Sequence, residues 1–176
     1  MKKMLIVVDM QKDFVNGSLG SPQAQAIVPF VTSKIAEYKK DGSKIIFTRD
    51  THYENYLDTQ EGKRLPVVHC VEGTDGHSIS DELDTVGCEI FDKPTFGSLA
   101  LAEHLADSFG DVEEIELCGL CSDICVVSNA LILKAQFPEV TVTVDVKCCA
   151  GVTEESHEAA LLTMRMCQVN VIGGEK

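Results

Sequence analysis

Three side chains that can perform nucleophilic chemistry, those of Asp9, Lys93 and Cys125, each follow a β-rich apolar run in this chain. We expect Cys125 to lie where a buried strand turns into a helix covering about 123–136. At such a helix start, free backbone N–H groups and the positive end of the helix dipole favour the thiolate. The same N–H groups can stabilise an oxyanion formed when the thiolate attacks a carbonyl. A carboxylate and an ammonium beside that thiol would complete a nucleophilic site, so the combination predicts an enzyme.

A second group of side chains is of a kind that binds metal ions. Asp50, His52 and His69 offer ligands suited to Zn²⁺, Mn²⁺ or Fe²⁺. All three lie in the segment 50–87, which is rich in His, Gly, Asp and Glu and has little periodicity. Segments of that length without regular structure are usually functional or disordered. On these residues alone, a metal site and a loop without metal remain equally open.

The elements that must position these side chains alternate between strand and helix. The β-rich runs cover 4–9, 44–48, 88–92, 113–118, 140–144 and 168–172. One expected helix, stopped by Gly42, has apolar residues at helical spacing, namely Ala24, Ile27, Val28, Val31, Ile35 and Tyr38. Further helices are expected over 99–106, over about 123–136 and from Thr153 onward. This alternation predicts a three-layer α/β/α fold with a six-stranded, mainly parallel sheet in Rossmann-like order.

The expected sheet would bring the reactive side chains together. Asp9, Asp50, Lys93 and the turn that carries Cys125 all follow different strands at their carboxyl ends. In open α/β sheets, ligands bind at that edge. We therefore expect one site along the carboxyl edge of the sheet.

Composition restricts the possible partners of the protein. The 15 basic and 28 acidic side chains give a formal charge of −13, which disfavours nucleic acid and anionic membranes. Apolar runs fall well short of the roughly 18–20 residues that span a membrane. We expect a single domain over 1–176, a cytoplasmic location, eight cysteines present as free thiols, and a homo-oligomer.

Taken in order and spacing, several motifs are similar to those of a known family over nearly the whole chain. The motifs are Val8-Asp9-Met10-Gln11-Lys12-Asp13-Phe14, Thr48-Arg49-Asp50-Thr51-His52, His69-Cys70-Val71-Glu72-Gly73-Thr74, Lys93, Gly119-Leu120-Cys121-Ser122-Asp123-Ile124-Cys125-Val126, and Asp145 with Glu155, His157 and Ala160. In these motifs the chain resembles the isochorismatase-like cysteine hydrolases and, within them, the nicotinamidases.

The resemblance implies a catalytic triad of Asp9, Lys93 and Cys125. Asp9 would take the thiol proton, and Lys93 would stabilise both anions. A small carboxamide such as nicotinamide would pass through a Cys125 thioester to the acid and ammonia. The resemblance also implies an oxyanion hole made by the backbone N–H groups of Cys121 and Cys125, and a cis peptide at Leu120–Cys121.

The nicotinamidase motifs also imply one divalent metal ion, Zn²⁺, Mn²⁺ or Fe²⁺, that holds the ring nitrogen of the substrate. Its ligands would be Asp50, His52 and His69, with Glu61 matching a fourth position by spacing and Asp58 as the weaker candidate. Residues expected to contact the substrate are Phe14, Leu65, Phe96 and Leu120. Leu65 stands where nicotinamidases commonly carry an aromatic residue, which leaves the identity of the amide open.

Other functions remain to be weighed. The first strand is followed by no G-x-G-x-x-G, which argues against a dinucleotide-binding module. Cys118 and Cys121 form a C-x-x-C without a second copy, so redox chemistry or a structural zinc site is the weaker interpretation. His157 is expected to be structural. The main alternatives are a metal-free isochorismatase-like hydrolase of another substrate and a non-catalytic binding member of the family.

Overall fold

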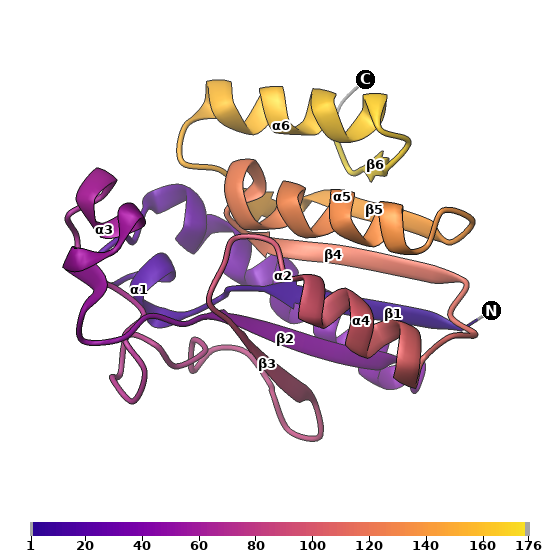
Figure 1. Cartoon of the computed structure of the whole chain (residues 1–176). Coiled ribbons are helices and arrows are strands. Elements are labelled where there is room, and N and C mark those ends of the chain that lie inside the picture. The colour runs from indigo at the N-terminus through magenta and orange to yellow at the C-terminus, as the bar shows by residue number, and fades with distance from the viewer. Residues whose placement is uncertain (1, 175–176) are drawn as a thin grey trace.

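A computed structural model describes residues 2–174 of the chain, and within them the strands form one sheet. The sheet has six strands in the order β3-β2-β1-β4-β5-β6, and every pairing between neighbours is parallel. This is the order of a doubly wound nucleotide-binding fold. The predicted fold class is therefore confirmed, and the sheet is parallel throughout (Figure 1).

The strands agree with the β-rich runs in place, although several differ in length. Their bounds are β1 Lys3–Val8, β2 Lys44–Asp50, β3 Glu89–Lys93, β4 Glu114–Leu120, β5 Thr141–Ala150 and β6 Asn170–Ile172. The largest difference is β5, expected to end at 144, which continues to Ala150 after a shift in its register with β4. Polar Asp145 and Lys147 interrupt the apolar run there and hid the second half of the strand.

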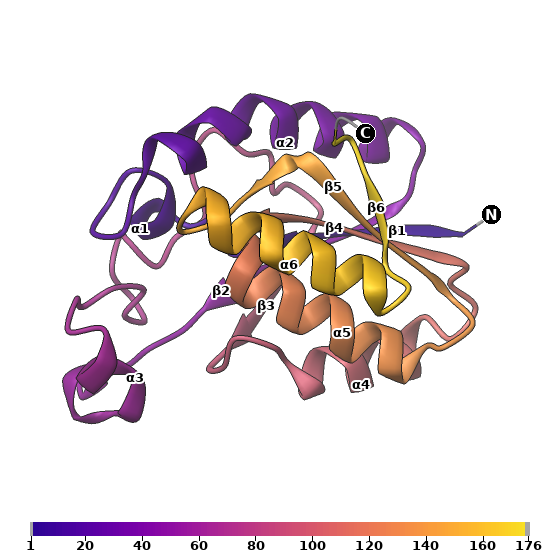
Figure 2. The same cartoon turned by 90° about the horizontal axis from the view of Figure 1, so that it is seen from above.

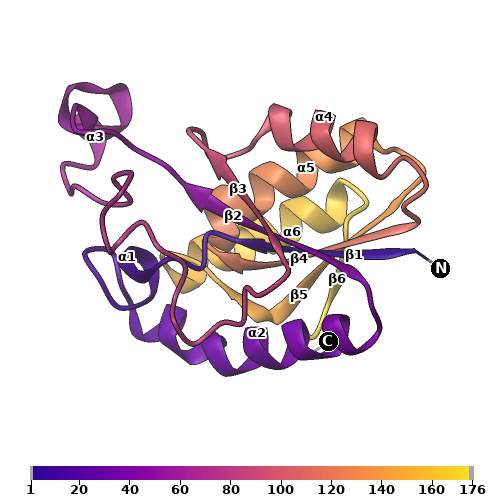
Figure 3. The ribbon, with the colours of Figure 1, turned by 90° about the horizontal axis from the view of Figure 1, so that it is seen from below.

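The longer helices form the outer layers of the fold. Their bounds are α2 Pro22–Lys40, α4 Leu99–Ser108, α5 Val127–Gln136 and α6 Glu154–Met166. Seen from above and from below, α2 covers one face of the sheet, and α4, α5 and α6 cover the other (Figures 2 and 3). Right-handed crossovers require this arrangement, because the chain moves toward one sheet edge from β1 to β3 and toward the other edge from β3 onward.

Helix α2 shows how the sequence pattern produces the packing. Ser21 caps its start by accepting a hydrogen bond from the N–H of Ala24, and Pro22 occupies the first helical position, where its missing N–H has no cost. Its buried residues are the six predicted from periodicity, Ala24, Ile27, Val28, Val31, Ile35 and Tyr38. Gly42 follows with a φ of 69°, a left-handed conformation that glycine adopts readily.

The core is built on the central strands. Residues Leu5–Val8 of β1 are fully buried, as expected for a parallel strand covered on both faces. All eight cysteines are free thiols. Over residues 2–174, none of the helices combines the length and apolar character that crossing a membrane would require.

Short helices lie beyond the carboxyl edge of the sheet, where the reactive side chains are expected. They are α1 Lys12–Val15, the 3-10 helix η1 Tyr56–Asp58 and α3 Gln60–Arg64 (Figure 1). The last two belong to the segment 50–87, which is thus more ordered than its lack of periodicity indicated. Gly62 allows α3 to pack on η1, because a Cβ there would lie 2.1 Å from the backbone oxygen of Tyr56.

Candidate active site

Four neighbouring strands deliver the predicted site residues to one edge. Asp50 and Lys93 are the last residues of β2 and β3, which pair with each other in register at these two positions. Asp9 follows β1 directly, and Cys125 lies in the turn after β4. Because the spatial order is β3-β2-β1-β4, all four side chains lie along a continuous stretch of the edge.

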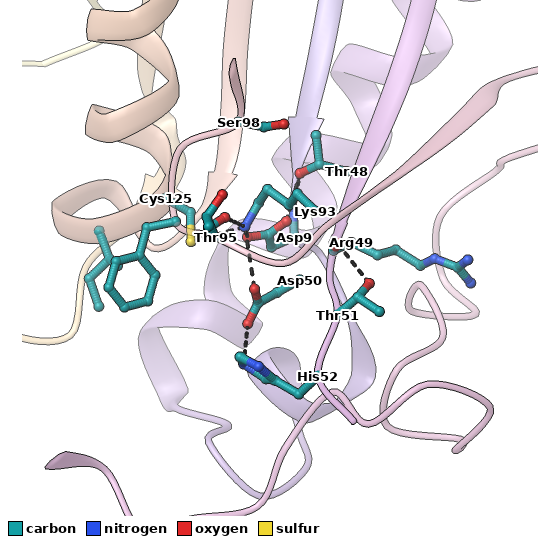
Figure 4. A network of polar contacts seen from close by, with 12 residues as sticks. Asp9, Thr48, Arg49, Asp50, Thr51, His52, Lys93, Thr95, Ser98 and Cys125 are labelled. Carbon is teal, nitrogen blue, oxygen red and sulfur yellow. Dashed lines mark hydrogen bonds and ion pairs between the residues drawn. The ribbon is translucent and has the colours of Figure 1, made fainter. Parts of the chain in front are cut away.

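Lys93 is the centre of a compact polar network (Figure 4). Its Nζ lies 2.7 Å from Asp9 Oδ2 and 3.4 Å from Cys125 Sγ, and its side chain is 0% exposed. The same Nζ donates a hydrogen bond to the backbone oxygen of Thr95 at 3.1 Å and lies 3.6 Å from Asp50 Oδ1. The structure thus brings the three residues of the expected triad into direct contact.

Asp9 is held in place by its backbone and by Thr48. The residue adopts a φ of 47°, which turns the chain sharply at the end of β1. The hydroxyl of Thr48 donates to Asp9 Oδ1 at 2.6 Å and accepts from the Asp9 N–H at 3.2 Å. One carboxylate oxygen is therefore fixed by Thr48, and the other is directed at Lys93.

Cys125 lies in a π-helix, η2 Ser122–Val126, which α5 continues. The expected single helix over 123–136 is thus two segments, and wide π turns of this kind are frequent at functional sites. The predicted cis peptide at Leu120–Cys121 is present just before η2. Asn129 fixes the turn, since its Nδ2 donates to the backbone oxygens of Cys125 at 2.8 Å and Phe96 at 3.0 Å.

Burial and neighbouring charges shift the pKa values of all three side chains of the network. Burial raises the pKa of Cys125 well above its usual range, and the negative charge of Asp9 raises it further. Burial also raises the pKa of Asp9, against the attraction of Lys93. Burial alone would lower the pKa of Lys93, but the charges of Asp9, the cysteine thiolate and Asp50 outweigh it and raise the pKa. Burial and the charge of Asp9 thus oppose the stabilisation of the thiolate that was expected from the helix start.

Beside this network lies a cluster of metal-ligand type. One side-chain atom from each of Asp50, His52, Glu61 and His69 lies within 4.8 Å of all the others. His52 Nε2 is 3.0 Å from Asp50 Oδ2 and 3.6 Å from Glu61 Oε1, and His69 Nε2 is 3.7 Å from Asp50 Oδ2. Of the two acidic candidates, Glu61 joins the cluster, whereas Asp58 lies exposed on η1.

The cluster fits a divalent cation in the chemistry of its donors. His69 Nδ1 lies 2.7 Å from the backbone oxygen of Val67, which can only accept, so Nδ1 carries the proton and Nε2 presents a lone pair to the cluster. His52 Nε2 is buried, and its 3.0 Å contact with Asp50 Oδ2 does not have the geometry of a hydrogen bond. Two imidazoles and two carboxylates are a donor set typical of zinc and related ions.

A cavity of about 680 Å³ joins the two groups of residues. Cys125, Asp50, His52, Glu61 and His69 all contribute to its lining. Its apolar walls include the four residues expected to contact the substrate, Phe14, Leu65, Phe96 and Leu120, together with Ile124 and Val152. A small molecule in this cavity can therefore reach the thiol and the ligand cluster at the same time.

Several residues that shape the site were given no role by the sequence reasoning. Besides Thr48 and Asn129, the buried Tyr56 packs against both cluster histidines, with ring centroids 4.6 Å from His52 and 5.0 Å from His69. An aromatic residue four positions after His52 was the signal available in the sequence. His157, expected to be structural, lies with Nδ1 2.6 Å from the hydroxyl of Ser122, which anchors α6 to η2.

The model of the isochorismatase domain family matches residues 3–176. The nicotinamidase/pyrazinamidase of Mycobacterium tuberculosis is 28% identical over 97% of this chain and 98% of its own length. The nicotinamidase of Saccharomyces cerevisiae is also 28% identical, over 73% of this chain and 80% of its own.

Solved structures show the same architecture. The pyrazinamidase of Pyrococcus horikoshii, solved in complex with zinc, superposes with a TM-score of 0.85 at 28% identity, covering 99% of this chain and 100% of that protein. The similarity therefore includes both the sheet and the segments beyond its carboxyl edge.

Proposed function

The chain belongs to the isochorismatase family, and from this premise we propose that it is an amidohydrolase converting nicotinamide, or a similar small carboxamide, to the acid and ammonia. One observation carries the proposal. A single cavity places Cys125, which contacts Lys93, next to the cluster of Asp50, His52, Glu61 and His69. The named activities of the M. tuberculosis and S. cerevisiae relatives support the same reaction class.

In the first half of the proposed reaction, the Cys125 thiol attacks the carboxamide carbon and passes its proton to Asp9. The raised pKa of Asp9 makes its carboxylate a stronger base than an exposed aspartate, which suits this transfer. Lys93, 2.7 Å from Asp9 and 3.4 Å from the sulfur, stabilises negative charge on either partner. Attack and proton transfer proceed together, since the high pKa of the thiol disfavours a free thiolate.

The remaining steps return the site to its starting state. Backbone N–H groups of Cys121 and Cys125 donate to the oxyanion formed when the C–S bond forms. Asp9 then gives its proton to the nitrogen, the C–N bond breaks, and ammonia leaves a thioester on Cys125. A water molecule attacks the thioester as Asp9 takes its proton, the C–S bond breaks, and the proton returns to the sulfur as the acid is released.

Asp50, His52, Glu61 and His69 would hold the divalent ion in this proposal. When bound, such an ion supplies a coordination position for a heteroatom of the substrate, such as the ring nitrogen of nicotinamide. The P. horikoshii neighbour, solved with zinc, supports zinc as the first ion to test. A ring held through its nitrogen at this position would have its carboxamide group directed toward Cys125.

A different carboxamide is the second candidate substrate. Leu65 gives the cavity an aliphatic wall at the position where an aromatic residue would stack on a pyridine ring. The volume of about 680 Å³ falls within the range of pockets that take molecules of drug size.

The reaction and its metal dependence are tested by ammonia release from nicotinamide, pyrazinamide and benzamide, each with and without chelator. Benzamide matches nicotinamide in shape but lacks the ring nitrogen. We expect hydrolysis of nicotinamide to exceed that of benzamide, and chelation to remove most of the difference. Equal rates for all three amides, unaffected by chelation, would contradict the metal role, and no ammonia from any carboxamide would contradict the reaction class.

The nucleophile is tested by Cys125→Ala, with Cys121→Ala as the matched control. We expect Cys125→Ala to lower kcat by about four orders of magnitude or more, because the covalent step is lost. The Cys121 thiol lines the same cavity, but the proposed role of this residue is confined to its backbone N–H, so Cys121→Ala should keep measurable turnover. Near-normal turnover by Cys125→Ala would rule out the thioester route.

A further inference from the structure

Gln11 lies directly behind the site, two residues after Asp9 and immediately before α1. Its side chain is 0% exposed, and its amide makes three hydrogen bonds. The Asp50 N–H donates to Gln11 Oε1 at 2.7 Å, and Gln11 Nε2 donates to the backbone oxygens of Asp50 at 2.8 Å and His77 at 3.0 Å. These partners define the amide orientation, because a backbone N–H can only donate and a carbonyl oxygen can only accept.

These three hydrogen bonds lie just beyond the last paired residues of β1 and β2. The register of the two strands ends at the pair Val7 and Phe47, and the chain then turns away at Asp9. Beyond this turn, the Gln11 amide binds both the N–H and the C=O of Asp50, as a backbone peptide group of a neighbouring strand would. Gln11 therefore extends the strand pairing by one side chain and ties the turn of Asp9 to the end of β2.

The residue that Gln11 holds has two functions in the site. Asp50 Oδ2 is 3.0 Å from His52 Nε2 in the ligand cluster, and Asp50 Oδ1 is 3.6 Å from Lys93 Nζ in the network of the thiol. The hydrogen bond from Gln11 to the carbonyl oxygen of His77 also holds in place the segment that carries His69. A small shift of the Asp50 backbone would change both sets of distances.

We propose that Gln11 is a positioning residue that sets the Asp50 carboxylate between the metal cluster and the thiol network. The inference rests on the proposed metal ligands and adds a residue that touches neither the ion nor the substrate. Partners that orient metal ligands typically affect metal affinity by about 10–100-fold. Loss of the Gln11 amide should therefore weaken metal binding by about tenfold.

The test compares Gln11→Met with Tyr38→Phe. Met keeps a similar volume and removes all three hydrogen bonds. Tyr38 lies on α2 away from the site, and its hydroxyl donates a buried hydrogen bond to Glu116 Oε2 at 2.6 Å, so Tyr38→Phe removes a buried bond elsewhere. Zn²⁺ affinity is measured by competition with a chromogenic chelator, and the melting temperature of the metal-free protein is measured alongside.

Both variants should lower the melting temperature by a few degrees. Gln11→Met alone should raise the Kd for Zn²⁺ about tenfold, and Tyr38→Phe should leave it within twofold of wild type. Wild-type Zn²⁺ affinity in Gln11→Met would overturn the inference, as would equal weakening in both variants. If Gln11→Met does not fold, Gln11→Asn, which keeps an amide one methylene too short to reach Asp50, is judged by the same criteria.

Failure of the inference is distinct from failure of the proposed function. Wild-type protein that binds no Zn²⁺ would overturn the metal ligands and the role of Gln11 together. Tight Zn²⁺ binding that is equal in wild type and Gln11→Met would overturn only the role of Gln11 and leave the metal cluster intact.

Discussion

Replacing Lys93 with Met should expose how strongly the buried charges depend on one another. Met retains most of the aliphatic stem but leaves Asp9, which is fully buried, without the ammonium 2.7 Å away. Removing one partner of a buried ion pair typically costs about 3–5 kcal/mol, because the remaining charge is left uncompensated. Because a domain typically has about 5–15 kcal/mol of stability, the variant should unfold at much lower urea concentration.

The double variant Asp9→Asn/Lys93→Met separates this charge effect from lost packing. Asp9→Asn alone should cost less, because Lys93 keeps Asp50 as a partner 3.6 Å away. Combining Asp9→Asn with Lys93→Met should restore about 1–3 kcal/mol of stability, since no uncompensated carboxylate then remains at position 9. Turnover should stay abolished in all three variants, because each lacks either the proton acceptor or the ammonium.

Urea unfolding followed by circular dichroism, repeated across pH, provides the measurement. In Lys93→Met the ammonium no longer opposes burial and the hydrogen bond from Thr48 remains, so the pKa of Asp9 in the folded state rises further above its ordinary value of about 4. The folded protein then binds this proton more tightly than the unfolded chain does, and the stability deficit should shrink as pH falls through the raised pKa. An unchanged urea midpoint for Lys93→Met, or strictly additive costs in the double variant, would refute this account of the site.

Two further outcomes follow from the same geometry. Asp9→Asn should abolish turnover yet shift the pH profile of Cys125 alkylation by iodoacetamide to lower pH, because the Asp9 charge raises the pKa of the thiol; a shift to higher pH would contradict this. Glu61→Gln should raise the Kd for Zn²⁺ about tenfold, whereas Asp58→Asn, on the neighbouring exposed turn, should leave it unchanged in chelator competition; the reverse pattern would move the fourth ligand to Asp58.

The fold was largely predictable because its signals are local and repeated. The helical spacing from Ala24 to Tyr38 specifies one buried stripe, and the structure buries that stripe. Asp9, Asp50 and Lys93 could be placed together because parallel strands deliver their carboxyl ends to one edge. The second half of β5 was missed because Asp145 and Lys147 break the apolar pattern, although backbone pairing continues through them.

The chemistry of the site was less predictable because it depends on burial and distant neighbours. The position of Cys125 near a helix start indicated a thiolate, whereas burial and the charge of Asp9 raise the pKa of the thiol. Neither effect can be read from adjacent residues. Gln11 and Thr48 looked like ordinary polar residues in two motifs, and their roles appear only when β1 and β2 lie side by side. Glu61 could be matched by spacing alone, but its place in the cluster depends on α3.

The shared position of Asp50 has a consequence for how this site can diverge during evolution. Its two carboxylate oxygens lie near different parts of the site: Oδ2 is close to His52 of the ligand cluster, and Oδ1 is close to Lys93 of the thiol network. A substitution there changes metal preference and nucleophile environment in one mutational step, so natural variation should be rare at this position. Glu61 reaches the cluster from α3 and has its close contacts with the two histidines. Exchange of metal or substrate preference among descendants should therefore begin at Glu61 and on α3, while Asp50 stays constant.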